Sequence, residues 1–448
     1  MNSVRPAAVA GMFYPGDARA LAAEVDDLLD GVGVPVPRLG YPKALVVPHA
    51  GYIYSGPVAA RAYDELVAAR GSVRRVVLLG PTHRVAVKGL AVPSAAAFAT
   101  PLGTVRIDAE ALREVSDLPQ VVASDAAHAL EHSLEVQLPF LQKVLGEFAL
   151  APFAVGAASV QEVAEVIERL WGGPETLIVV STDMSHYHSY EQARAIDGAT
   201  IDRIAAFATD IDHEEACGAT PLNGLLFSSK KKNLSLKLLS ACNSGDTAGG
   251  KGRVVGYSAF GLYQGGEVSL DEAGRTLLSI ARASIESHLL GESKDTASVS
   301  WLGQTGATFV TLTRNGELRG CIGSLEPARA LGEDVARNAL GAAFRDPRFP
   351  AMSAQDWPHC RVEVSLLSTP KPLRFAEEDD LLEQIEAGED GLIIEADGKR
   401  GTFLPQVWED LGDKRVFLAH LLKKAGLPAD TRLTRCKVSR YRVFKWQE

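Results

Sequence analysis

Short, fully apolar segments recur along the first half of the chain, and they constrain the fold more than any other feature. Most of them are followed by Gly, Pro, Asp or His and then by a helical pattern, which is the order of a βα unit. Strands of this kind form a parallel sheet whose two faces are buried by helices. The first part is therefore predicted to be an α/β domain with a mainly parallel, twisted sheet flanked by helices. The predicted strands are residues 44–47, 75–79, 176–180 and 254–260.

Two helices between these strands are predicted from local signals. Ser55-Gly56 is typical of a turn and Pro57 suits the first position of a helix, so a helix is expected over residues 57–70. A second helical pattern begins at Gln161 and leads into the next strand. In sheets of this kind, functional residues collect beyond the carboxyl ends of the strands.

A domain boundary is expected near Gly265-Gly266. A strand ends just before these glycines, and Ser269 with Glu272 has the spacing of a capping box that starts a new helix. Beyond it the chain changes to short strands separated by turns, with Asn315-Gly316 as a strong hairpin signal. The C-terminal run RYRVFKW alternates basic and apolar residues, as a half-buried edge strand does. The predicted domains are residues 1–264 and, as a smaller α+β domain, residues 267–448.

Composition and charge limit the class of protein. Hydrophobic residues make up 46% and charged residues 23%, which is typical of a soluble globular protein. No segment reaches the roughly 18 apolar residues of a membrane span, and the start of the chain lacks the apolar core of a secretory signal. Five scattered cysteines do not form a disulfide framework, so we expect a cytoplasmic protein. A formal charge of −10 argues against a nucleic-acid partner.

Seven of the ten histidines precede the boundary, and three predicted strands lead to metal- or proton-binding side chains. His49 follows the first strand, His83 follows the second, and the third leads to Asp183 and His186. If these strands are neighbours, the side chains meet in one cleft. Neutral imidazole is the commonest protein metal ligand, so a metal or acid–base site is predicted. The seven histidines are His49, His83, His128, His132, His186, His188 and His213.

Cys217 is the candidate for a further ligand. It precedes Thr220-Pro221, which resembles the first turn of a helix, and a thiol near a helix N-terminus loses its proton more readily. Such a thiolate suits a metal ligand or a nucleophile, and a small buried hydrophobic residue is the structural alternative. His132 and Glu135 are three residues apart on a predicted helix and share a face. There they either orient a ligand or form a polar pair that caps the helix.

Six segments of the first part resemble the Memo family in order and spacing: PHAGYIYSG, GPTH, EHSLEVQLPFL, STDMSHY, ACGATP and GYSAF. The resemblance spans residues 5–263. It implies kinship with the extradiol ring-cleaving dioxygenases, which hold non-haem Fe(II) with two His and one Glu. It places His49 and His83 in the two His positions and Cys217 where the dioxygenase has its Glu. It also makes His186 the acid–base group, and Asp183 beside it could fix the tautomer of that ring.

A thiolate in place of a carboxylate makes such a site softer, so Zn or Cu compete more strongly with iron. Fe(II) is the favoured metal, with Cu or Zn as alternatives. Metal binding is expected to survive this change better than ring cleavage does.

The second part resembles the AMMECR family over about residues 268–446, in ELRGCIGSLEP, AFRDPRFP, EVSLLSTP and TFLPQVWED. Within LRGCIG, alternation along a strand puts Arg319 and Cys321 on one face, where the cation would favour a nucleophilic thiolate. The structural alternative is a bulge at the glycines around a buried thiol. The loop that contains Asp346 and Arg348 could be an ion-paired pocket rim or an anion site.

Three functions remain open from the sequence. The first is a non-haem, dioxygenase-like metal-dependent enzyme, or a component of one, that acts on a small molecule or peptide. The two resemblances imply a radical-SAM protein as partner. This chain itself lacks the CxxxCxxC run of such an enzyme, so any radical chemistry would come from that partner. The second is a protein that binds a metal or peptide without turnover. The third is a cysteine-based hydrolase that pairs Cys217 with His49 or His186.

Overall fold

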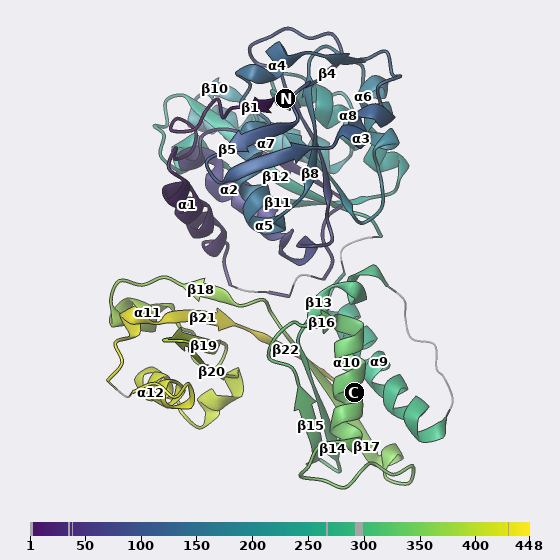
Figure 1. Ribbon diagram of the computed structural model, residues 1–448, viewed down its shortest axis with the longest axis vertical. Helices are drawn as coiled ribbons and strands as arrows, with labels where there is room; N and C mark the ends of the chain where they lie inside the picture. Colours follow the sequence, from purple (N-terminus) through teal and green to yellow (C-terminus); the bar gives the residue numbers. More distant parts are fainter. Residues whose placement is uncertain (1–2, 35, 38, 266–267, 292–298, 429) are drawn as a thin grey trace. The chain divides into compact units, whose positions relative to one another are not determined.

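The computed structural model describes residues 3–34, 36–37, 39–265, 268–291, 299–428 and 430–448. The chain divides into two compact units, shown in Figure 1. The early segment Gly33–Gly40 belongs to the second unit, where Leu39 packs on the core and the N–H of Gly40 donates to Gln304. No sequence signal predicted this excursion. The first unit comprises Met1–Val32 and Tyr41–Glu267, and the second comprises Gly33–Gly40 and Val268–Glu448.

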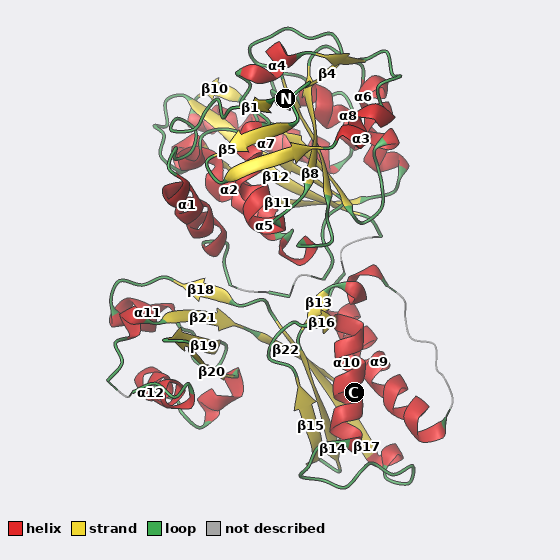
Figure 2. Ribbon diagram, in the orientation of Figure 1, coloured by secondary structure: helices red, strands yellow, loops and turns green. Residues whose placement is uncertain are grey.

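A twelve-stranded sheet runs through the first unit, and helices cover both of its faces (Figures 1 and 2). Its four central strands are parallel and almost wholly apolar, which is why both of their faces are buried. They lie in the order β8 (Ala149–Val155), β3 (Arg75–Pro81), β9 (Thr176–Ser181) and β2 (Ala44–Val47). The predicted mainly parallel α/β domain is confirmed.

Shorter or antiparallel strands extend this centre. Beyond β8 lie β6 (Gly103–Ile107), β5 (Ala97–Thr100) and β1 (Val4–Arg5), and beyond β2 lies β12 (Val254–Tyr263), which runs antiparallel to it. β12 also pairs with β10 (His186–His188) and β11 (Ser235–Asn243), and β4 (Leu90–Val92) pairs with β7 (Val121–Ala123) and β8.

Each face of the sheet has its own hydrophobic core. One core is built by α1 (Ala18–Asp30), α2 (Tyr52–Asp64), α4 (Asp125–Ala129) and α5 (Leu138–Leu145). The other is built by α3 (Ala109–Glu114), α6 (Val160–Arg169), α7 (Tyr190–Ala205) and α8 (Ala219–Lys231).

The prediction that a helix starts at Pro57 is wrong. Helix α2 begins at Tyr52, and Pro57 lies inside it. Ser55-Gly56 is helical because Gly56 is a packing position: a Cβ there would lie 2.8 Å from Leu28 of α1. The missing N–H of Pro57 removes one bond of the helix ladder, close to its first turn, where the loss costs least.

The second unit contains two four-stranded sheets, each with its own helices (Figure 2). The first has the order β15 (Glu317–Gly323), β14 (Thr308–Arg314), β17 (Cys360–Leu367) and β22 (Val443–Gln447), with α9 (Leu270–Leu290) and α10 (Leu331–Phe344) in its core. The second has the order β18 (Lys371–Leu373), β21 (Lys437–Tyr441), β19 (Gly391–Ala396) and β20 (Lys399–Phe403), with α11 (Glu378–Gln384) and α12 (Lys414–Lys424). β13 (Thr305–Gly306) pairs with β16 (Arg329–Ala330).

Several local predictions for this unit are confirmed. Asn315 and Gly316 both have positive φ, at 52° and 87°, and form the hairpin turn between β14 and β15. Ser269 caps α9 by accepting the N–H of Glu272. The C-terminal run ends in the edge strand β22, although its first residues belong to β21 in the other sheet.

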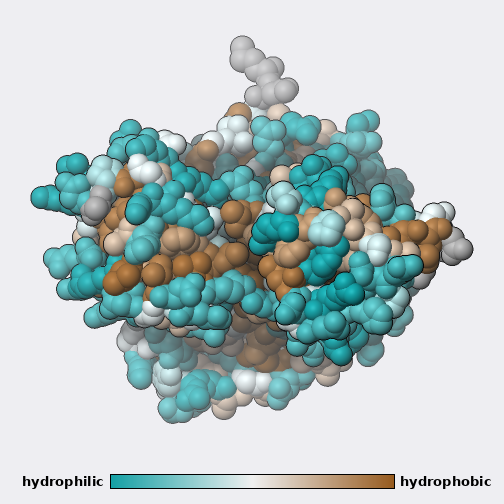
Figure 3. Space-filling model, turned by 90° about the horizontal axis from the view of Figure 1, so that it is seen from below, coloured by the Kyte–Doolittle hydropathy of each residue, from teal (hydrophilic) through white to brown (hydrophobic). Residues whose placement is uncertain are grey.

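Figure 3 shows one face of the molecule, on which hydrophilic side chains predominate and apolar ones run between them across the middle of the view. Exposed apolar residues of the second unit include Leu318, Leu325 and Val416. Within the described parts of the chain, no helix combines the length and apolarity needed to cross a bilayer.

Candidate metal centre

The three strand ends predicted to carry functional residues are neighbours. β9 lies between β3 and β2, and all three strands run in the same direction. His49, His83 and Asp183 each lie two residues beyond the carboxyl end of their strand. The sheet therefore delivers these side chains to one place, as the sequence argument required.

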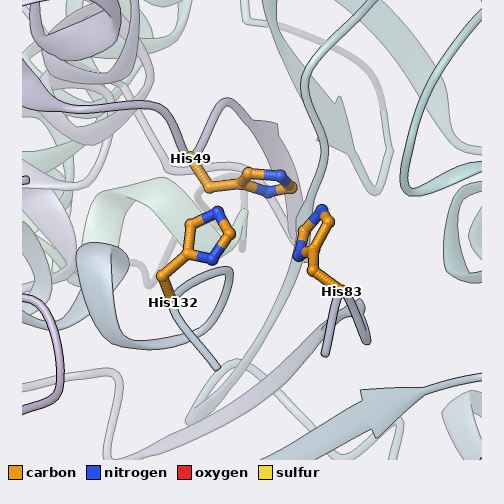
Figure 4. Close-up of side chains that lie close together, drawn as sticks. All are labelled: His49, His83 and His132. Atoms are coloured by element: carbon orange, nitrogen blue, oxygen red, sulfur yellow. The ribbon is translucent and has the colours of Figure 1, made fainter. Parts of the chain in front are cut away.

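Three imidazoles form the centre of this place. Each of His49, His83 and His132 offers a ring nitrogen, and these atoms all lie within 4.8 Å of one another. Figure 4 shows the three rings turned toward a common point. Their centroids are 5.2 Å apart for His49 and His83, and 4.6 Å apart for His83 and His132. This group could hold a metal ion.

Ser181 fixes the tautomer of His49. Its hydroxyl donates its one hydrogen to the carbonyl of Ser133 at 2.6 Å and accepts the amide N–H of Gln137 at 2.9 Å. The Nδ1 atom of His49, 2.8 Å from the same oxygen, must therefore be the donor. Nε2 of His49 is then left with a free lone pair. Burial, together with the neighbouring imidazoles, holds the pKa of His49 well below its usual value, so the ring stays neutral.

Glu131 fixes the position of the Nδ1 hydrogen of His83. Its carboxylate, which is 2% exposed, lies 2.9 Å from Nδ1 of His83 and also accepts the backbone N–H of that residue at 2.6 Å. Burial opposes the charge, yet the hydrogen bonds from His83 and Ser133 lower the pKa of Glu131 to about 2. An ionised carboxylate only accepts, so Nδ1 of His83 carries a hydrogen, and Nε2 is the ring nitrogen that can bind a metal.

His132 and Glu135 do not share a helix face, contrary to the prediction. His132 lies in the loop before the 3₁₀ turn Glu135–Gln137, and its ring joins the other two histidines. Burial lowers its pKa to about 4. Glu135 turns to the N-terminal segment, where its carboxylate accepts from Arg5 at 2.5 Å and from the hydroxyl of Tyr14 at 2.6 Å.

This N-terminal segment packs against His132, one of the three histidines. The backbone N–H groups of Ala8 and Val9 also donate to Glu135, at 2.8 and 3.0 Å. The ring of Phe13, a few residues later, lies 4.7 Å from the ring of His132. Glu135 thus holds in place the segment that packs on one of the imidazoles.

Cys217 lies beside His49, with its Sγ atom 3.3 Å from the free Nε2. It precedes α8, as expected, but the helix does not favour the thiolate. Burial and the neighbouring Asp183 raise the pKa of Cys217 to about 12, so the thiol is protonated in the absence of a metal. The sequence-based expectation of an activated thiolate is therefore wrong for the metal-free state.

Asp183 is buried and bonds to His49. Its carboxylate accepts the backbone N–H of His49 at 2.7 Å, and its second oxygen lies 3.9 Å from Nε2 of that residue. Burial raises its pKa to about 7. The expected role of fixing the tautomer of His186 does not match this geometry. His186 is partly buried at the start of β10, and burial with the nearby His83 lowers its pKa.

In the second unit, the LRGCIG segment is a bulged edge strand. The register shifts between Leu318 and Gly320, so Cys321 pairs with Thr311 and Leu318 pairs with Thr313 on the same face. Arg319 is the extra residue of this bulge and has no partner on β14, so the simple alternation that predicted one face for Arg319 and Cys321 does not hold here. Arg319 is 8% exposed and donates to the carbonyl of Pro350. The half-buried Cys321 thiol accepts from the hydroxyl of Thr311 at 3.2 Å.

Asp346 and Arg348 cover the open edge of that strand. Asp346 accepts the N–H of Cys321 at 2.9 Å, and Arg348 donates to the carbonyl of Cys321 at 3.3 Å. Arg348 also pairs with Asp346, and this side-chain bond holds the pKa of Asp346 well below its usual value. The loop takes the place of a neighbouring strand, which protects the edge from pairing with other chains.

Glu131, Ser181 and Gln137 were missed in the sequence. None of them stands out by periodicity, because each acts through a partner distant in the chain. A usable signal was the acidic residue directly before His132 in EHS, since carboxylates commonly orient metal-binding imidazoles.

Comparison with known proteins gives two family matches. A family model described as Memo-like protein matches residues 5–260, and one described as AMMECR1 matches residues 278–446. MEMO1 family proteins from Ignicoccus hospitalis and Aquifex aeolicus are 37% and 39% identical over 284 and 267 residues, each covering 57% of this chain and 97% of the relative. A crystal structure of the uncharacterised protein PH0010 from Pyrococcus horikoshii is 35% identical and covers 40% of this chain and 92% of its own, with a TM-score of 0.35. The chain belongs to the Memo family and carries an AMMECR1 domain after its Memo domain.

Proposed function

We propose that the Memo domain is a mononuclear Fe(II) centre of a dioxygenase-like enzyme, which works with a radical-SAM protein on a small-molecule or peptide substrate. The observation that carries the metal proposal is that Ser181 and Glu131 hold the Nδ1 atoms of His49 and His83, which leaves the Nε2 atom of each ring as the one to bind a metal. Neutral imidazoles with fixed tautomers are ready metal ligands.

The third ligand is either Cys217 or His132. Cys217 lies 3.3 Å from Nε2 of His49, and the thiol would release its proton to solvent on coordinating a metal. His132 already meets the other two imidazoles within 4.8 Å and needs to lose no proton. We propose Cys217 as the ligand, with His132 beside the open side of the centre. A ferrous ion held by three protein ligands has positions open for dioxygen and substrate.

Proton transfer is assigned to Asp183 and His186. A carboxyl group with a pKa of about 7 can both hold and release a proton at neutral pH, and burial gives Asp183 this property. A protein that only grips a ligand has no need of such a group, so Asp183 favours an enzyme over a binding protein. The raised pKa of Cys217 argues against a cysteine-based hydrolase, which needs a ready thiolate.

Exposed apolar side chains on the segments that carry the site residues favour a substrate with an apolar or aromatic group. Met12, Ile53, Tyr54, Leu130 and Tyr187 are all exposed. Each is close in sequence to a site residue: Met12 precedes the Phe13 that packs on His132, Leu130 precedes Glu131, and Tyr187 follows His186. Tyr187 has a φ of 65°, and such strain is usually kept only at functional positions.

The radical-SAM partner is supported by the covalent linkage of the two domains. Two modules on one chain are kept at a high effective concentration, which favours joint action on one substrate. The chain has no cluster-binding CxxxCxxC run, so radical chemistry would come from another protein.

The test uses the full chain reconstituted with Fe(II) without oxygen. Nitric oxide, a stand-in for dioxygen, should give the electron paramagnetic resonance signal of a ferrous nitrosyl with an open coordination position. Asp183→Asn should keep that signal, because Asp183 is not a ligand in this account. A reconstituted wild type without the signal would contradict an oxygen-binding centre. For the partner, a radical-SAM protein from the same organism should co-purify with the full chain, and its failure to bind under reducing conditions would remove that part of the proposal.

A further inference from the structure

We propose that Glu131 is the positioning residue of the metal centre, and that its carboxylate holds the ring of His83 and the backbone of His132 at once. The inference rests on the proposed metal function, and it deepens it by naming the group that sets metal affinity from outside the ligand set.

Glu131 spends all of its hydrogen-bonding capacity on the two histidines and the residue that follows them. One oxygen accepts the backbone N–H of His83 at 2.6 Å. The other accepts Nδ1 of His83 at 2.9 Å, the backbone N–H of His132 at 2.9 Å and that of Ser133 at 3.0 Å. Four donors, three of them backbone N–H groups, thus converge on one carboxylate that is almost wholly buried.

Holding His83 by both its backbone and its ring leaves that side chain little freedom. The ring cannot rotate without breaking its bond to Glu131, and the backbone cannot move away from the same carboxylate. The Nδ1 hydrogen is thereby fixed, and Nε2 is presented to the centre as a lone pair. A hydrogen-bonded carboxylate also makes the imidazole a stronger ligand.

The loop that carries Glu131 is itself fastened to the end of β3. The hydroxyl of Ser133 donates to the carbonyl of Pro81 at 2.8 Å. Gly80 permits this approach, because a Cβ there would lie 2.8 Å from the Ser133 hydroxyl oxygen. Glu131 therefore acts from a fixed support, as a positioning residue requires.

Glu135 offers a matched control within the same segment. It is as buried as Glu131, and its carboxylate also accepts from two backbone N–H groups and two side chains. None of those donors is an imidazole. A purely structural carboxylate at position 131 would behave like Glu135, and a positioning one would not.

The experiment compares the full-length wild type with Glu131→Ala, Glu131→Gln, Glu135→Ala and Glu135→Gln. The first readout is the dissociation constant for Co(II), titrated alone without oxygen. The second is the tautomer of His83 in the metal-free protein, from the nitrogen chemical shifts of its ring. We expect both Glu131 variants to bind Co(II) about 10–100-fold more weakly, with the alanine variant weaker than the glutamine variant. We also expect His83 to become a mixture of tautomers in Glu131→Ala, whereas the folded Glu135 variants keep the His83 tautomer of the wild type, because Glu135 does not contact that ring.

If Glu131→Ala does not fold, Glu131→Gln carries the test, because its NH2 group must face at least one of the four donors. Folded Glu131 variants with wild-type Co(II) affinity and an unchanged His83 tautomer would overturn the inference and leave the metal proposal standing. A wild type that binds no Co(II) would instead contradict the metal proposal, and the His83 tautomer would still decide the role of Glu131.

Discussion

The Sγ atom of Cys217 lies 3.3 Å from Nε2 of His49, the same nitrogen that Ser181 leaves with a free lone pair. A metal ion bound to Nε2 of His49 would therefore lie next to the thiol of Cys217. The choice between Cys217 and His132 as third ligand has a measurable consequence, because the two groups differ in whether a proton must leave.

The pH dependence of metal affinity should identify the third ligand. Burial raises the pKa of Cys217 to about 12 and lowers that of His132 to about 4. Above the pKa of free imidazole, His132 binds without losing a proton, whereas Cys217 must release one. With Cys217 as ligand, Zn(II) affinity should rise about tenfold per pH unit between about pH 7 and 9. Competition titrations should show that slope in the wild type and a flat profile in Cys217→Ser. A flat profile in the wild type would assign the position to His132.

Arg5→Met should destabilise the Memo domain strongly. Arg5 and Glu135 are both buried, and removing the arginine leaves an unpaired carboxylate among apolar residues. The expected loss is about 3–5 kcal/mol in the free energy of unfolding, measured by urea denaturation followed by circular dichroism. Arg61→Met, at an exposed position of α2, is the control and should change stability by less than about 0.5 kcal/mol. Equal effects of the two substitutions would mean that the Arg5 pair is not part of the core.

Gly320→Ala should destabilise the AMMECR1 domain through a packing clash alone. A Cβ at Gly320 would lie 2.1 Å from the carbonyl oxygen of Ala342 in α10, so the strand would have to move away from the helix. The expected cost is about 3 kcal/mol, at the upper end for overpacking. The control is Gly303→Ala, where nothing lies within 4 Å of the added Cβ. Thermal unfolding of both variants measures the difference, and a harmless Gly320→Ala would show that the β15–α10 contact is looser than described.

The layered fold could be predicted because it depends on local composition. The strands β2, β3 and β9 are continuous apolar runs, and their ends carry His49, His83 and Asp183. Local signals gave a wrong prediction where a residue serves tertiary packing. Gly56 and Pro57 predicted a turn followed by a helix start, yet α2 continues through both, and α1 packs against Gly56.

The candidate site was predictable for groups that lie just past strand ends and for Cys217, which lies just before a helix. His132 lies in a loop without periodicity, so its approach to His83 depends on how the chain folds back between α4 and α5. Glu131 and Ser181 act through hydrogen bonds to partners 48 and 132 residues away, and no pattern within one segment encodes such a pairing. The bulge at Arg319 likewise follows from pairing with β14, and simple strand alternation could not foresee it.

The most direct test of this account is the metal content of the full chain after reconstitution with Fe(II) in the absence of oxygen. The wild type, His49→Ala and His83→Ala are compared by elemental analysis after removal of unbound metal. We expect about one ion per chain in the wild type and much less bound metal in both variants. Each variant lacks one of the two imidazoles whose Nδ1 atom is held by Ser181 or Glu131 and whose Nε2 atom is available to the metal. A wild type without metal, or unchanged metal content in both variants, would contradict it.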